Sequence, residues 1–333
     1  MFVPATEDQA IASLRAAATL VDPPGAAPPS PTAGMGQTLL IAASQLFFSP
    51  PVDVSTSDLP PIAPETLARV IGPNPDLAQH VASLLAVASL ADGRLDDDRL
   101  RRVVEYAHHL GVHDGWVRDV LEIARGHMAW TMADMARRNV ATFPGWGDGQ
   151  DHLPPMLPYQ EQTDDDKRLA ARFLELETKP AATFGRHFFD HFRGHKFGFP
   201  GEYDAFTGAF AVPHDSLHVI SGYSTSLQGE ILVSTFTGGM HRPDNLRAHI
   251  LPVIIEWHVG SEVNGIGAQK GNLDPAKFLV AWERGQHTSI DALSPLWDFW
   301  SLVDKDLEEV RSDMSVEPLP EQYKASGEEI LGR

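Results

Sequence analysis

Residues 214–230, HDSLHVISGYSTSLQGE, are the stretch that decides the fold expected for this chain. A helix turns by about 100° per residue, so His214, Asp215 and His218 project into one quadrant of a single helix. Glu230 follows His218 by twelve residues, which is about 18 Å along a straight helix. The carboxylate therefore reaches the two imidazoles only if the chain turns back between them.

The residues between His218 and Glu230 encode that turn. Gly222 predicts the end of the first helix, because glycine adopts the left-handed conformation that commonly closes helices. Thr225, with Gln228 three positions later, predicts a capping box that opens a second helix. The stretch therefore predicts a helical hairpin, and helical spacing of apolar residues elsewhere extends the prediction to an all-α fold.

Two imidazoles and two carboxylates within seventeen positions predict a divalent metal site. Zinc is the first expectation, with iron, manganese and cobalt as alternatives, because all four ions accept nitrogen and oxygen ligands. Such a set can leave coordination positions open for water or substrate, as catalytic sites do. The alternative is that the histidines form an ordinary polar helix face and that Glu230 is a solvated charge.

The pattern His-Asp-x-x-His-x11-Glu resembles the signature of the coenzyme Q biosynthesis protein Coq-four family. Further along, Trp282-Glu283-Arg284-Gly285 resembles the aromatic, arginine and glycine element of that family. Leu307-Glu308-Glu309-Val310-Arg311 resembles its C-terminal end, and the whole match runs from about Arg168 to Val316. The chain departs from the family in carrying about 160 additional N-terminal residues and a longer C-terminal tail.

The resemblance implies a mostly helical fold and a divalent ion held by His214, Asp215, His218 and Glu230. Asp215 lies farthest round the helix, and the alternative for it is to orient a histidine without binding the ion. It implies a role in ubiquinone biosynthesis, with a prenylated aromatic or quinone lipid as ligand and oxidative decarboxylation of the ring as the reaction. Arg284 becomes a candidate contact for an anionic substrate group, against the alternative of an exposed ion pair. The other function that the resemblance supports is a non-catalytic lipid-binding scaffold that organises further biosynthetic enzymes.

Composition excludes several partners. The formal charge of −19 and the pI near 5.1 argue against nucleic acid and against electrostatic attachment to anionic lipids. Any contact with the inner face of a membrane would then use an apolar patch of a peripheral protein. Cysteine is absent, which excludes thiolate ligands and fits a cytoplasmic location. The chain lacks the phosphate-binding and serine-hydrolase motifs, and homo-oligomerisation stays open.

Proline-rich segments indicate the domain boundaries. We expect a flexible proline-rich arm with short helices at 1–60, a helical domain at 61–142, a linker at 143–165, the metal-binding domain at 166–316 and a tail at 317–333. The segment from Ala86 to Asp98 resembles the opening of tellurite-resistance B-like helical domains. Asp92 and Asp96 to Asp98 offer oxygen ligands for a cation, but helix capping is favoured because the calcium-loop pattern is missing.

Two other sets of residues have alternative interpretations. His187, His191 and His195 recur at four-residue spacing and would form a second metal site, although the interleaved phenylalanines favour the polar edge of an amphipathic helix. Four tryptophans either line a pocket for an aromatic ring or belong to the hydrophobic core, and the hydrophobic core is favoured. They are Trp257, Trp282, Trp297 and Trp300.

Overall fold

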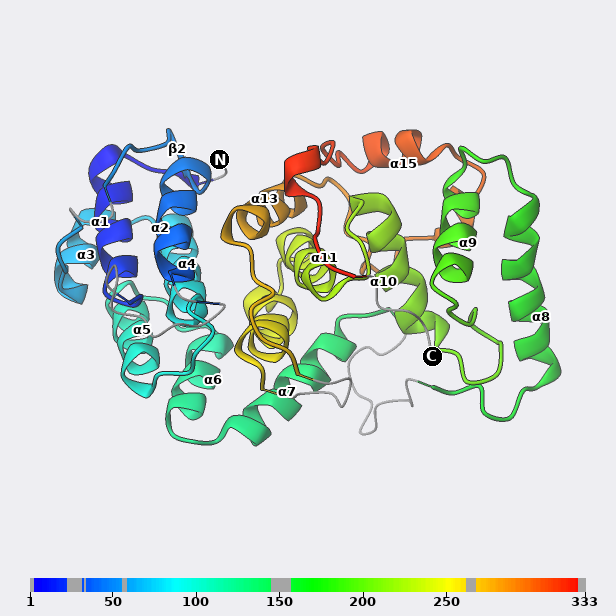
Figure 1. Ribbon diagram of the computed structural model, residues 1–333, viewed down its shortest axis with the longest axis horizontal. Helices are drawn as coiled ribbons and strands as arrows, with labels where there is room; N and C mark the ends of the chain where they lie inside the picture. Colours follow the sequence, from blue (N-terminus) through cyan, green and yellow to red (C-terminus); the bar gives the residue numbers. More distant parts are fainter. Residues whose placement is uncertain are drawn as a thin grey trace. The chain divides into compact units, whose positions relative to one another are not determined.

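Helices make up nearly all of the regular structure in the computed structural model, which describes residues 3–22, 32, 34–55, 59–144, 157–261 and 268–328 (Figure 1). The strands found in these ranges, β1 (Val3–Pro4) and β2 (Phe48–Ser49), form one short parallel pair with Val3 opposite Phe48. The predicted all-α fold is therefore confirmed. No described helix combines the length and the apolar character that crossing a membrane requires.

The chain divides into two compact units, each built from two separate segments. Unit 1 comprises Met1–Ala136 and Pro243–Glu283, and unit 2 comprises Arg137–Arg242 and Arg284–Arg333. The helices assigned to unit 1 are α1 (Glu7–Ala18), α2 (Met35–Leu46), α3 (Pro64–Ile71), α4 (Pro75–Leu90), α5 (Asp97–His109), α6 (Gly115–Ala124) and the run η3 (Leu246–Ile250), α12 (Leu251–Ile254) and η4 (Ile255–Val259). Two helices contain a unit boundary: α7 (Met128–Ala141) and α13 (Pro275–Gln286).

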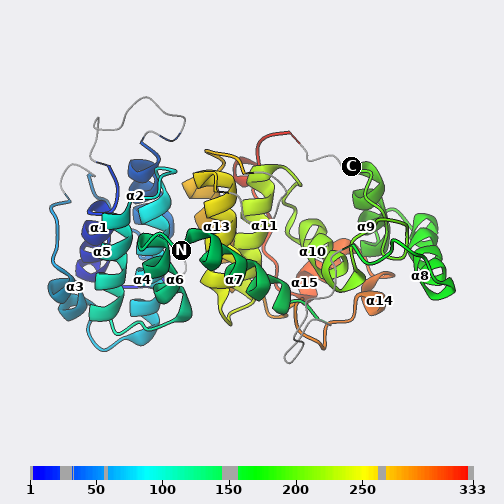
Figure 2. The ribbon, with the colours of Figure 1, turned by 90° about the horizontal axis from the view of Figure 1, so that it is seen from below.

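This division differs from the predicted one at the N-terminus. Helices α1 and α2 pack against each other, and α1 also packs against α3 and α4, as Figure 2 shows for the bundle of unit 1. Ala10, Leu14 and Leu39 are completely buried. Helices α1 and α2, from the region predicted to be an arm with short helices, therefore contribute to the core of unit 1. The proline-rich run at 23–31 and residues 145–156 of the predicted linker lie outside the described residues.

A second difference is that residues 243–283, expected in the metal-binding domain, belong to unit 1. One contact that holds them there is a buried ion pair, in which the Arg247 guanidinium of η3 binds the carboxylate of Asp119 on α6 and lies 2.6 Å from Asp134. Arg247 is 4% exposed and Asp119 is fully buried. Burial is the main reason why the pKa of Asp119 is raised, although the arginine opposes that effect.

Side chains cap two helices of unit 1, and the capping predicted for the aspartates near Asp96 is confirmed. The Thr6 side chain accepts from Gln9 N–H, and the Gln9 side chain accepts in return from Thr6 N–H, which forms a capping box for α1. Asp96 caps α5 by accepting from the amides of Asp98 and Arg99. Asp92 instead accepts from backbone amides and pairs with Arg99. The aspartates at 92 and 96 thus stabilise helix ends and a loop.

Unit 2 places one helix at its centre. Helix α10 (Gly208–Ser221) packs against α9 (Phe184–Gly194), α11 (Leu227–Met240) and α15 (Leu307–Asp313), and in Figure 1 it lies between α9 and α11. The remaining helices of the unit are α8 (Asp164–Leu174), η2 (Glu175–Thr178), α14 (Phe299–Leu302) and η5 (Glu321–Tyr323). Buried phenylalanine rings in mutual contact form its aromatic core: Phe173, Phe184, Phe188, Phe192, Phe199 and Phe299.

Gly285 has a packing role that explains the glycine after Arg284. A β-carbon at this position would lie 2.1 Å from the carbonyl oxygen of Phe236 on α11. Only glycine lets the end of α13 approach the backbone of α11 so closely. Because α11 also carries Glu230, this contact fixes the helix that supplies the carboxylate of the candidate site.

Candidate metal site

The predicted hairpin forms, with one correction at its second helix. Helix α10 ends at Ser221, and Gly222 follows in the left-handed conformation with φ of 81°. The cap of α11 is Ser226, whose hydroxyl accepts from Gly229 N–H 3.1 Å away. The predicted cap, Thr225, is therefore wrong by one residue, because Ser226 offers the same hydroxyl chemistry at the next position.

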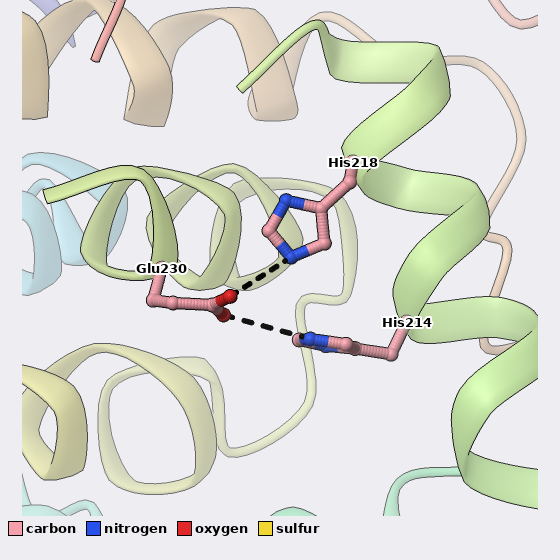
Figure 3. A group of neighbouring side chains, drawn as sticks. All are labelled: His214, His218 and Glu230. Atoms are coloured by element: carbon pink, nitrogen blue, oxygen red, sulfur yellow. Dashed lines mark ion pairs between the residues drawn. The ribbon is translucent and has the colours of Figure 1, made fainter. Parts of the chain in front are cut away.

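Three of the four predicted ligands converge. His214 and His218 lie on consecutive turns of α10, and Glu230 lies in the first turn of α11, pointing back at them (Figure 3). The Glu230 carboxylate is 3.5 Å from His214 Nε2 and 3.3 Å from His218 Nε2. One donor atom from each residue lies within 4.8 Å of the others. A single ion of the size of zinc or iron, with ligand bonds of about 2.0–2.2 Å, fits between donors at such separations.

His218 is oriented for coordination by its backbone neighbourhood. Its Nδ1 lies 3.0 Å from the carbonyl oxygen of Tyr223, so Nδ1 carries the proton in the neutral ring and Nε2 is left as the electron-pair donor. The His218 side chain is 1% exposed, and its buried Nε2, 3.3 Å from the Glu230 carboxylate, has no other hydrogen-bond partner in the described chain. A buried acceptor in this position, facing a carboxylate, fits a metal ligand.

The protonation states of His218 and Glu230 also support a metal site. Burial alone would lower the pKa of His218, but the Glu230 carboxylate outweighs that effect and raises it from 6.5 to about 9. Burial alone would raise the pKa of Glu230, yet His218 and His214 hold it well below its usual range. Without an ion, the buried carboxylate is therefore balanced by a proton on His218, which is the charge that a metal ion would replace.

This coupling predicts how metal affinity depends on pH. The raised pKa of His218 stabilises the metal-free fold below pH 6.5, and this contribution is lost as the pH rises through about 9. An incoming ion must displace the proton, so we expect affinity to rise about tenfold per pH unit between roughly pH 7 and 8.5. Calorimetric titration in buffers of different ionisation enthalpy should show about one proton released per ion. Affinity that does not change over this range would contradict the coupling.

Asp215, the fourth predicted ligand, points elsewhere. Its Oδ1 lies 2.9 Å from His191 Nε2 on α9, and it is not among the donors that converge with His214. Burial by itself raises the pKa of Asp215, but the hydrogen bond from His191 outweighs it and lowers the pKa. Burial lowers the pKa of His191, so a neutral His191 donates to the Asp215 carboxylate. The described geometry places Asp215 beside the candidate site, bound to another histidine.

Flat rings pack against both imidazoles of the candidate site. The Phe210 ring stacks on His214 with centroids 5.0 Å apart and planes inclined by 15°. The His191 ring stacks on His218 at 5.5 Å and 23°. The spacing of Phe210 from His214 is four residues, a helical signal that the sequence interpretation missed. The contact between His191 and His218 joins two helices and leaves no such signal.

Arg284 is buried, not paired at the surface as the alternative proposed. It is 3% exposed, and its Nη2 donates to the carbonyls of Ser221 and Glu317 at 2.9 and 2.8 Å. The rings of Tyr223 and Phe236 lie 5.3 and 5.6 Å from the guanidinium carbon. Because Ser221 is the last residue of α10, Arg284 caps the carboxyl end of the helix that supplies both histidines.

Arg311 also binds backbone carbonyls at the end of α10, those of the two residues that precede Ser221. Its Nε and Nη2 each donate over 2.9 Å, to the carbonyls of Ile220 and Val219 respectively. Arg284 and Arg311 together bind three of the carbonyls that the end of α10 leaves unsatisfied. These roles were not predicted, since the arginines follow the helix by 63 residues or more and a bond to a backbone carbonyl has no sequence signature.

The second set of histidines and Trp282 have surroundings other than those of a metal or ring site. His187 is exposed on α9, and within the described residues the donors of His187, His191 and His195 form no metal-binding group. Trp282 packs against Phe47 and Phe278 in the core of unit 1. Comparisons with protein-family models, with curated protein sequences and with solved structures found no match.

Proposed function

We propose that the chain binds one divalent metal ion through His214, His218 and Glu230. The observation that carries this proposal is the convergence of two imidazole nitrogens and one carboxylate on a single point, with His218 Nε2 buried and otherwise without a hydrogen bond. Two histidines and one carboxylate form the ligand set of catalytic zinc sites and of non-haem iron sites. Zinc remains the first expectation, with iron, manganese and cobalt as alternatives.

The chemistry follows from the number of protein ligands. Three ligands leave positions on the ion for an oxygen of a bound molecule. An ion held there would polarise a phenolic or carboxylate oxygen and would activate water or dioxygen. The chain's own contribution is to orient the two imidazoles through Tyr223 and the stacked rings, and to supply a carboxylate whose charge balances the ion.

The ligand we propose is a prenylated aromatic or quinone lipid, in line with the resemblance to the Coq-four family. The reaction proposed for it is oxidative removal of a ring carboxylate, and a carrier or scaffold for other biosynthetic enzymes is the alternative. The support for an acidic ligand is the buried pair of Arg284 and Tyr223, whose Nη1 and hydroxyl have no hydrogen-bonding neighbour in the described chain apart from each other. Burial raises the pKa of Tyr223, and Arg284 opposes this, so the hydroxyl stays protonated and able to donate.

Lipid extraction from the purified protein, followed by mass spectrometry, tests the ligand class. A co-purifying prenylated aromatic acid supports the enzyme. Incubation of that acid with metal-loaded protein and dioxygen should then release the carboxylate as carbon dioxide and place a hydroxyl group from water on the vacated ring carbon, with dioxygen taking up the two electrons as hydrogen peroxide. A finished quinone, or an acid that is bound but not converted, supports the scaffold. Absence of any aromatic lipid would contradict both.

We expect Arg284→Lys to keep the metal but to weaken binding of an aromatic acid by about tenfold or more, because lysine lacks the planar fork that grips a carboxylate. Arg311→Lys is the matched control, since it removes the same kind of helix-end contact without a predicted contact to the ligand. Metal content by elemental analysis and acid affinity by calorimetry should separate the two variants. Wild-type acid affinity in Arg284→Lys would remove this arginine from the ligand site.

A further inference from the structure

A buried carboxylate beside the candidate metal site has its own partner. Asp215 follows the ligand His214 directly in the chain, yet its Oδ1 accepts from His191 Nε2 at 2.9 Å. Both side chains are about nine-tenths buried, with exposures of 11% and 10%. A hydrogen bond to a carboxylate in such surroundings is stronger than a neutral one, so it fixes the orientation of the His191 ring.

The ring that Asp215 fixes lies flat against a ligand of the candidate site. The His191 and His218 rings are 5.5 Å apart between centroids and inclined by 23°. His191 also has the ring of His195 at 4.8 Å between centroids, and His195 Nδ1 lies 2.8 Å from the backbone oxygen of His191. His191 is thus held by a carboxylate, by a neighbouring ring and by its own helix.

We propose that Asp215 and His191 are positioning residues that fix the plane of the His218 imidazole, with Asp215 acting through His191 and not as a ligand. This inference rests on the proposed metal site. The backbone carbonyl of Tyr223 lies 3.0 Å from His218 Nδ1 and holds one edge of the ring. The flat His191 ring on one face restricts tilting of the His218 ring, so that Nε2 stays directed at Glu230.

The geometry makes a specific claim about energetic coupling. If Asp215 acts only by holding His191, removing the charge of Asp215 should lower metal affinity when His191 is present. The same change should hardly lower metal affinity when the ring at position 191 cannot donate a hydrogen bond. A ligand would behave differently, because its loss would cost the same affinity in both backgrounds. Loss of a residue that orients a ligand typically weakens metal binding by about 10–100-fold.

The test is a double-mutant cycle with Asp215→Asn and His191→Phe, which keeps a flat ring at 191 but removes the donor. Cobalt(II) is the probe, because its visible absorption reports both affinity and coordination. We expect each single variant to bind one cobalt ion per chain with affinity reduced about 10-fold or more. The double variant should lose no more than about twofold beyond the weaker single variant, and the absorption maxima should match those of the wild type.

His187→Phe is the matched control, since this exposed histidine lies one turn earlier on the same helix and should not change affinity. Additive losses in the cycle, a changed cobalt spectrum in Asp215→Asn, or wild-type affinity in that variant would each overturn the positioning role. Circular dichroism of every variant confirms that it is folded. If the wild type binds no cobalt, the proposed metal site fails and this inference fails with it; if only the cycle disagrees, the metal site stands.

Discussion

Replacing both histidines, His214→Ala with His218→Ala, should abolish stoichiometric metal binding. The double variant removes both imidazole nitrogens and leaves Glu230 as the remaining member of the converging group. One carboxylate does not hold a transition metal ion at micromolar concentration, because such sites are built from several nitrogen and oxygen ligands. Elemental analysis after removal of loosely bound ions should therefore fall from about one ion per chain to near zero.

A matched control uses two histidines at the same spacing outside the site. His109→Ala with His113→Ala also removes two imidazoles four residues apart, and the converging group described here does not include them. This variant should keep the wild-type metal content. If the double variant at His214 and His218 retained its ion, the site would have to be sought at His191 and its neighbours.

The second large effect should follow from Arg247→Met in unit 1. The substitution leaves the buried carboxylate of Asp119 and the nearby carboxylate of Asp134 without the cation that binds both. Breaking a buried ion pair by removing one partner typically costs about 3–5 kcal/mol, because the remaining charge is buried without compensation. We expect a loss of this size in the free energy of unfolding at pH 7, measured by denaturant titration.

The pH dependence of this variant provides an internal check. Burial already raises the pKa of Asp119 while Arg247 lowers it, so removing the arginine raises that pKa further. A raised carboxylate pKa means that protonation stabilises the fold, and the loss should shrink as the pH falls from 7 towards 5. Arg125→Met, which removes a cation that is 55% exposed, should change stability by about 0.5 kcal/mol or less. Equal losses in the free energy of unfolding in the Arg247→Met and Arg125→Met variants would contradict the claim that burial makes the Arg247 ion pair important for stability.

Local signals in the sequence predicted the helices well, whereas long-range packing could not be predicted. Asp96 and Gly222 mark helix ends because their chemistry acts within one turn. The packing of α1 and α2 into the core of unit 1 was not predicted, because the small buried residues of α1 show their partners only in three dimensions. The return of residues 243–283 to unit 1 depends on contacts such as that between Arg247 and Asp119, which are 128 residues apart.

The candidate site shows the same limit at the scale of single side chains. His214, His218 and Glu230 were predictable because helical periodicity and one turn determine where they point. Asp215 lies on the same helix and is also a potential ligand, but it is rotated by about 100° from His214 and lies at the edge of that helix face. There His191 of α9 donates a hydrogen bond to it. Sequence spacing identifies the residues that share a helix face, but neighbouring helices decide which of them meet.

The most direct test is metal titration of the wild-type protein, combined with X-ray absorption spectroscopy of the loaded form. We predict one zinc or iron ion per chain, with scattering from two imidazole rings and one carboxylate, and the remaining positions filled by light oxygen ligands. Binding far below one ion per chain, or a spectrum without imidazole scattering, would contradict a metal site at His214, His218 and Glu230.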